Sequence, residues 1–163
     1  MGALIAIDRI VGKILRGIPV VCFVALFGIL FVNVVSRYFQ IWAFSWFDEI
    51  VEALFAYLVF LGAAALWREN EHFRIDWMEM ALGRPFGPIL RIVSVLLSMA
   101  FLAIMAVKGL DLTMRSRAAT PILSVPTAYI YAVIPVSAAI MLVYSVRDFA
   151  VALLAAIKPS VKP

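Results

Sequence analysis

The chain alternates between long apolar segments and shorter polar ones. Four runs without a charged residue approach the length needed to cross a bilayer, which takes about 20 apolar residues in a helix. With their flanking turns they predict spans over about residues 18–37, 45–67, 88–112 and 126–148. Helices are expected rather than strands, because the runs show no period-two alternation and lipid offers the backbone no hydrogen-bond partners. The pattern predicts one all-α integral membrane domain over residues 1–163.

Two segments outside the spans have the pattern of helices that lie at a membrane surface. Between about residues 3 and 17, apolar and polar side chains separate onto opposite sides of a helix. The polar side carries Asp8, Arg9, Gly12, Lys13 and Arg16. Pro19 favours a break before the first span, and the alternative is that the segment continues that span. Two apolar stripes flank a polar sector over about residues 71–82, which predicts a second interfacial helix.

The distribution of positive charge predicts the orientation of the chain. Ten of the 14 Lys and Arg residues lie in the N-terminal segment, the connection between the second and third spans, and the C-terminal tail. The other two connections hold the remaining four. Because cytoplasmic loops retain positive charge, both termini are predicted to lie in the cytoplasm. This topology accounts for the net charge of +4, and no nucleic-acid partner is expected.

Composition narrows the possible chemistry. The chain is 66% hydrophobic and 15% charged, whereas about a quarter of residues are charged in soluble proteins. Its single histidine, His72, excludes bis-histidine haem ligation, and its single cysteine, Cys22, excludes a membrane thiol oxidoreductase. We therefore expect no catalytic residue, cofactor or metal, and no enzymatic activity. His72 is interpreted as a structural residue beside Asp76 or a loop carbonyl, or as a partner contact.

Three carboxylates open the second span, Asp48, Glu49 and Glu52, and on a helix they form one patch. The aromatic side chains of "WAFSW" and the following Phe47 resemble an interfacial belt, which places the patch at the outer headgroup level. Three interpretations are open. The carboxylates could complement the helix dipole with Ser45 as N-cap, dock a periplasmic partner, or hold an ion.

The centres of the predicted spans carry no charged residue, although a carrier or channel acting alone would place an ionisable group there. They hold small residues that let helices approach closely, such as Gly62, Ala63–Ala65, Ser94 and Ser98. The sequence thus indicates a helical body that packs against other helices. An alternative is a small four-helix multidrug carrier acting as a homodimer, but it would need a carboxylate deep in the first span, which lacks one.

Four motifs in register resemble the small membrane subunit, or Q subunit, of tripartite ATP-independent periplasmic (TRAP) transporters. They are "NVVSRYF", "SWFDE", "FLGAAALWRENEHFRIDWM" and "VPTAYIYAVIPVSAAIM", and the resemblance covers Val32 to Arg147. The positions that match family signatures are Trp46, Asp48, Glu49, Arg68, His72, Arg74, Asp76, Tyr131 and Pro135. Asp48 stands where glutamate is usual, and Asn70 and Glu71 stand where a glycine commonly precedes the histidine.

The resemblance implies a complex of three parts in the bacterial inner membrane. A periplasmic solute-binding protein captures a substrate, usually an organic acid, and a large M subunit moves it by an elevator-like motion, typically coupled to sodium. The small subunit would be a static brace.

Residues implied in docking the binding protein are Asp48, Glu49, Glu52, Arg115 and Arg117. Residues implied in structural or partner contacts are Arg37, Trp46, Arg68, His72, Arg74, Asp76, Tyr131 and Pro135. Pro135 is also expected to kink the fourth span, as a fixed feature or as a hinge.

Overall fold

The computed structural model describes residues 2–39, 45–69 and 86–157. Within these ranges the secondary structure is helical, apart from one isolated bridge between Ala119 and Pro126. The helices are α1 (Gly2–Tyr38), α2 (Phe47–Arg68), α4 (Phe86–Arg115), α5 (Thr127–Tyr131) and α6 (Val133–Ile157). Within the described ranges, four stretches are long and apolar enough to cross a membrane: Asp8–Tyr38, Phe47–Arg68, Ile92–Arg115 and Thr127–Ala150. The all-α prediction with four spans is confirmed at this level.

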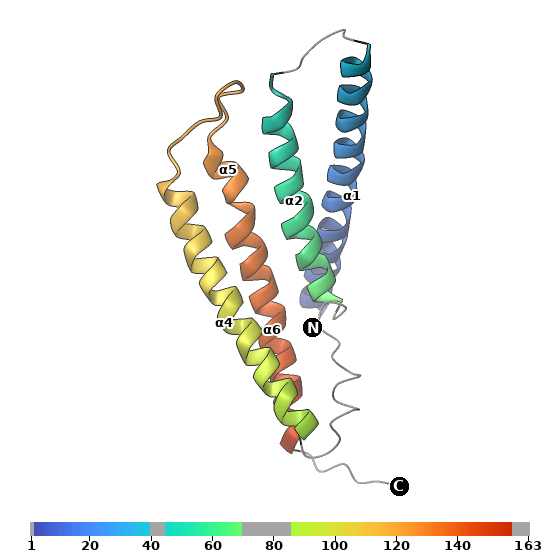
Figure 1. The fold of residues 1–163 in the computed structure, drawn as a ribbon. Coiled ribbons are helices and arrows are strands. Elements are labelled where there is room, and N and C mark those ends of the chain that lie inside the picture. The colour runs from blue at the N-terminus through green and yellow to red at the C-terminus, as the bar shows by residue number, and fades with distance from the viewer. Residues whose placement is uncertain (1, 40–44, 70–85, 158–163) are drawn as a thin grey trace.

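The four long helices stand in a row rather than in a closed bundle (Figure 1). Helix α1 packs on α2, α2 on α6, and α6 on α4, while the short α5 contacts α4, α2 and α6. Among the described residues, α1 and α4 are therefore the two edges of the row. The edge helices expose large apolar side chains, as at Phe27, which is 67% exposed, and Leu97, which is 72% exposed. Such broad apolar surfaces suit lipid or a protein partner.

The core runs through the middle of the row. Its buried side chains are Leu15, Leu61, Ala64, Leu102, Val133 and Met141. Ala64 is fully buried, in agreement with the expectation that small residues bring helices together. Helices α4 and α6 approach closely at Gly109, where an added Cβ would lie 3.0 Å from Cγ2 of Ile134 and 3.2 Å from the backbone nitrogen of Pro135. Gly109 thus sets the spacing of α4 and α6.

The break expected at Pro19 is absent, because α1 is one continuous helix of 37 residues with Pro19 inside it. Residues 3–17 therefore continue the helix of the first span, which was the alternative interpretation, and their depth in the membrane stays a prediction. A proline removes one backbone hydrogen bond, but membrane helices tolerate it where neighbouring structure supports the helix. Here Pro19 is buried, and its Cβ would lie 3.9 Å from a Cβ added at Gly62 of α2. Packing against α2 holds the helix through the proline.

Pro135 lies near the start of the second helical piece of the fourth span, and the kink expected there stays a prediction. Helix α5 ends at Tyr131 and α6 begins at Val133, so Pro135 is the third residue of α6. A proline cannot donate to the carbonyl four residues earlier, here that of Tyr131, and it is best tolerated in a first helical turn. Ala132, between the two helices, keeps helical backbone angles of φ −59° and ψ −25°, and its N–H still donates to the Ala128 carbonyl. The use of Pro135 as a hinge stays a prediction.

Candidate functional site

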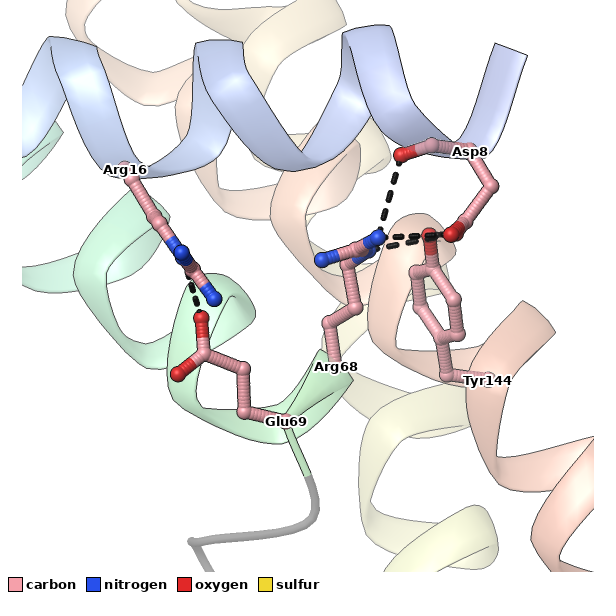
Figure 2. A network of polar contacts seen from close by, with 5 residues as sticks. All are labelled: Asp8, Arg16, Arg68, Glu69 and Tyr144. Carbon is pink, nitrogen blue, oxygen red and sulfur yellow. Dashed lines mark hydrogen bonds and ion pairs between the residues drawn. The ribbon is translucent and has the colours of Figure 1, made fainter. Parts of the chain in front are cut away.

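Polar contacts gather at both ends of α2. We call the end of the row where α2 finishes the basal end, and the end where α2 begins the apical end. At the basal end Asp8, Arg68 and Tyr144 form a cluster that joins α1, α2 and α6 (Figure 2). We call it the Asp8 cluster. It brings together residues separated by 60 and 136 positions in the chain.

The Asp8 carboxylate is the centre of this cluster. Arg68 donates from Nη2 to Oδ2 at 2.6 Å and from Nε to Oδ1 at 3.1 Å, and Nη2 also donates to the Asp8 carbonyl at 3.2 Å. Tyr144 donates its hydroxyl to Oδ1 at 2.7 Å. A planar guanidinium held by both oxygens of a carboxylate has a fixed geometry as well as a favourable charge interaction. The cluster therefore fixes the start of α1 relative to the end of α2.

Gly12 makes room for this arrangement. It lies one turn after Asp8, and a Cβ added there would lie 2.5 Å from Nη1 of Arg68 and 2.6 Å from its Cζ. Arg16, one further turn along α1, donates to Glu69 just past the end of α2. Two ion pairs with one intervening glycine thus attach α1 to the end of α2 (Figure 2).

At the apical end the three carboxylates differ in their surroundings. Glu49 turns toward the 116–126 connection and accepts the backbone N–H groups of Ile122 at 2.7 Å and Leu123 at 2.9 Å. Asp48 and Glu52 are exposed on α2. The N-cap of α2 is Trp46 and not Ser45, and it makes no side-chain capping bond, so that part of the prediction was wrong. Within the described residues, no group of His, Cys, Asp and Glu is arranged to hold a metal ion.

The segment of residues 116–126, which we call the apical loop, is internally hydrogen-bonded. Thr120 donates its N–H to the Val125 carbonyl at 2.9 Å and accepts the Val125 N–H on Oγ1 at 3.1 Å. Ser124 has a left-handed backbone with φ of 55°, which is uncommon outside glycine. The loop exposes Ile122 and Leu123, the two residues whose N–H groups bind Glu49. Glu49 thus orders an apolar loop tip.

The other predicted site residues fall at several places. Arg115 donates to Asp111 one turn earlier at 2.6 Å, and Arg117 is exposed at the start of the apical loop. Arg37 is exposed near the end of α1. Tyr131 and Pro135 are half-buried where α5 meets α6. His72, Arg74, Asp76 and the predicted helix over about 71–82 lie outside the described residues.

Arg68 was predicted as a structural or partner contact, and the Asp8 cluster shows the intramolecular contacts that it makes. Asp8 and Tyr144 were missed. The sequence pattern placed Asp8 on the polar side of the segment together with the cations. It is the only carboxylate among the charged residues of that segment, and this difference was not used. A lone acid followed one turn later by Gly12 is the feature that could have indicated an arginine from another helix.

Replacing Glu49 with alanine is expected to loosen the apical loop, because two backbone N–H groups lose their common acceptor. The amides of Ile122 and Leu123 should exchange faster in hydrogen–deuterium exchange, while α2 keeps its protection. Glu52→Ala is the matched control, since Glu52 is exposed one turn further along α2. Equal exchange in the two variants would show that Glu49 does not hold the loop.

Comparison with known proteins bears on the meaning of these contacts. Residues 26–155 match the family described as "Tripartite ATP-independent periplasmic transporters, DctQ component". A Haemophilus influenzae protein named "Putative TRAP transporter small permease protein" is 24% identical over 135 residues, which is 81% of each chain. The matched range includes Glu49, Arg68 and Tyr144 but begins after Asp8, Gly12 and Arg16.

Proposed function

The chain belongs to the DctQ family of tripartite ATP-independent periplasmic (TRAP) transporters, and we propose that it serves there as a static brace for the large membrane subunit. This is a family of transporter subunits and not of enzymes. The four apolar helices suggest a multi-pass membrane protein. The proposed location is the bacterial inner membrane, with both termini in the cytoplasm.

The observation that carries the brace proposal is that α2 makes polar contacts with its neighbours along its length, including both of its ends. Basally, Arg68 bonds to Asp8, and Trp67 donates Nε1 to Oγ of Ser145 at 2.8 Å. At the apical end Glu49 holds the apical loop, and near the middle of α2 Tyr57 donates its hydroxyl to the Tyr129 carbonyl of α5 at 2.9 Å. These hydrogen bonds and the ion pair join α2 to its neighbours at different depths, so they oppose sliding of α2 along those neighbours. A stationary neighbour of a subunit that moves through the bilayer needs this resistance.

The open row supports the same proposal. A closed bundle would cover more of its own helices, whereas this row leaves α1 and α4 as exposed edges. Large apolar surfaces of this kind mark lipid-facing or partner-facing sides. We infer that part of this surface packs against the large subunit. The substrate, proposed to be an organic acid, and the coupling to sodium would be properties of the whole complex.

Asp48, Glu52, Arg115 and Arg117 are the residues proposed to face a periplasmic solute-binding protein. Asp48, Glu52 and Arg117 are exposed and lie at the apical end, and Arg115 also retains an 80% exposed side chain beside Asp111. Charged rims of this kind steer association and set its salt dependence more than they add affinity. Glu49 contributes indirectly, by ordering the apical loop next to them.

Neutralising two of these charges tests the docking proposal. The double variant Asp48→Asn with Glu52→Gln is expected to lower binding-protein-dependent uptake several-fold at low binding-protein concentration, because the encounter loses its charge complementarity. Uptake of radiolabelled substrate into proteoliposomes with the complete complex measures this. Asp48→Glu with Glu52→Asp retains the charges and is expected to retain uptake. Equal uptake in the neutral variant, with normal complex assembly, would contradict the docking role.

The multidrug-carrier alternative has a separate test. Purified alone and reconstituted into liposomes, the chain is expected to catalyse no proton-linked transport. Transport by the chain alone would overturn the brace proposal, whatever the result of the docking variants.

A further inference from the structure

A row of positive side chains follows α1 at the basal end. Arg9, Lys13 and Arg16 are spaced by four and three residues, which places them along one face of the helix. All three are exposed. Arg16 pairs with Glu69 and keeps a 65% exposed side chain. Among the described residues, Arg9 and Lys13 have no ion-pair partner, so their charges are available to a ligand.

An apolar stripe runs beside these cations. Ile10, Ile14 and Ile18 are 56%, 51% and 38% exposed, and their spacing of four residues also places them along one face. On the other side of α1, Gly12, Leu15 and Pro19 are buried. Both stripes therefore point away from the α1–α2 interface. Their combination presents cations and aliphatic side chains next to each other on one accessible surface.

The length of α2 indicates the depth of this surface in the membrane. Helix α2 has 22 residues, and at 1.5 Å per residue it is about 33 Å long, close to the roughly 30 Å of a hydrocarbon core. Its last residue, Arg68, bonds to Asp8, and Glu69 pairs with Arg16. Residues 8–16 of α1 are therefore level with the end of a span that just crosses the bilayer. This is the level of the phospholipid headgroups.

The nearby acids leave the surface positive. Asp8 is held by Arg68 and Tyr144 on the α2 and α6 side of α1, and Glu69 is paired with Arg16. Arg9 and Lys13 therefore contribute unpaired positive charge to the exposed face among the described residues. Each cation near a membrane surface favours anionic lipid by about 1 kcal/mol.

We propose that Arg9 and Lys13, together with the Ile10, Ile14 and Ile18 stripe, bind an anionic phospholipid on the side of the membrane where the N-terminus lies. The two cations pair with the lipid phosphate, and the isoleucines lie along the upper acyl chain. The Asp8 cluster holds this part of α1 at headgroup level, so the site is formed before lipid arrives. The inference is independent of the proposed brace, because it requires only that the chain spans a membrane.

The site is tested with the full-length chain in mild detergent, by titration with phosphatidylglycerol, phosphatidylcholine or inorganic phosphate and detection of bound lipid by native mass spectrometry. Phosphatidylglycerol is expected to bind and phosphatidylcholine to bind much more weakly. The variant Arg9→Gln with Lys13→Gln should lose on the order of tenfold or more in phosphatidylglycerol affinity, from about 1 kcal/mol per cation. Excess inorganic phosphate should not displace the lipid.

A matched variant, Lys108→Gln with Arg117→Gln, removes two exposed cations from the apical half of the row: Lys108 lies toward the end of α4, and Arg117 lies in the apical loop. It should bind phosphatidylglycerol like the unmodified chain. Equal losses in both variants, full retention by the Arg9 and Lys13 variant, equal binding of phosphatidylcholine, or displacement by inorganic phosphate would each overturn the proposal. Because Arg9 and Lys13 are exposed and lack ion pairs among the described residues, their replacement should leave the thermal unfolding midpoint unchanged.

Discussion

Replacing Gly109 with leucine is expected to destabilise the helix row by about 3 kcal/mol, the upper end of the usual cost of overpacking. Even the Cβ would lie 3.0 Å from Ile134 Cγ2, 3.1 Å from Pro135 Cδ and 3.2 Å from the Pro135 nitrogen. The Pro135 atoms belong to a ring and a backbone that cannot rotate away, so α4 must move off α6. Thermal unfolding in detergent, followed by tryptophan fluorescence, measures the loss.

The control for this variant is Gly28→Leu in α1. Nothing lies within 4 Å of a Cβ added at Gly28. Both substitutions gain helix propensity, by somewhat less than 1 kcal/mol, so their difference isolates the steric contact. Gly28→Leu should leave the chain as stable as before or slightly more stable. Equal stability of the two variants would contradict the close α4–α6 approach at Gly109.

Replacing Gly12 with leucine is expected to detach the first turns of α1 from α2 and α6. The new Cβ would overlap with the Arg68 guanidinium, because it would lie only 2.5 Å from Nη1 of Arg68. Arg68 is flexible and can swing away, but it then loses both oxygens of Asp8. The expected result is faster hydrogen–deuterium exchange around Asp8, with the apical end unaffected.

Gly17→Leu is the matched control, because a Cβ at Gly17 has open space and the residue lies in the same helix. It should preserve the exchange pattern. Adding Arg68→Ala to Gly12→Leu removes the clash, and this double variant should regain part of the helix packing but not the Asp8 contacts. Unchanged exchange in Gly12→Leu alone would show that the Asp8 cluster does not hold α1.

Sequence periodicity predicted the number of spans because each span must satisfy its own backbone hydrogen bonds, which is a local requirement. It could not distinguish the effects of Pro19 and Pro135. Both remove one backbone bond, yet α1 continues through Pro19 while the fourth span is interrupted before Pro135. Both prolines pack against a neighbouring helix, Pro19 near Gly62 of α2 and Pro135 against Gly109 of α4, so the packing of the proline alone does not account for the difference.

The candidate site shows the same limit. The spacing of Asp48, Glu49 and Glu52 correctly put all three in the first turns of α2, but it could not show which of them faces the rest of the chain. Glu49 binds residues more than 70 positions later, and Asp8 meets Tyr144 from the opposite end of the sequence. Contacts of this range depend on the rotation of each helix about its axis, which a single sequence does not specify.

The order of helices in the row has a consequence for biosynthesis. Helices α1 and α2 are consecutive and pack together, so this pair can assemble while the ribosome is still translating. Among the described elements, α4 contacts only α5 and α6, which are made after it. The contacts of the third span with the rest of the described row can therefore form only after the last span has been synthesised. That interval makes α4 the segment most dependent on surrounding lipid or on an insertion factor during membrane assembly.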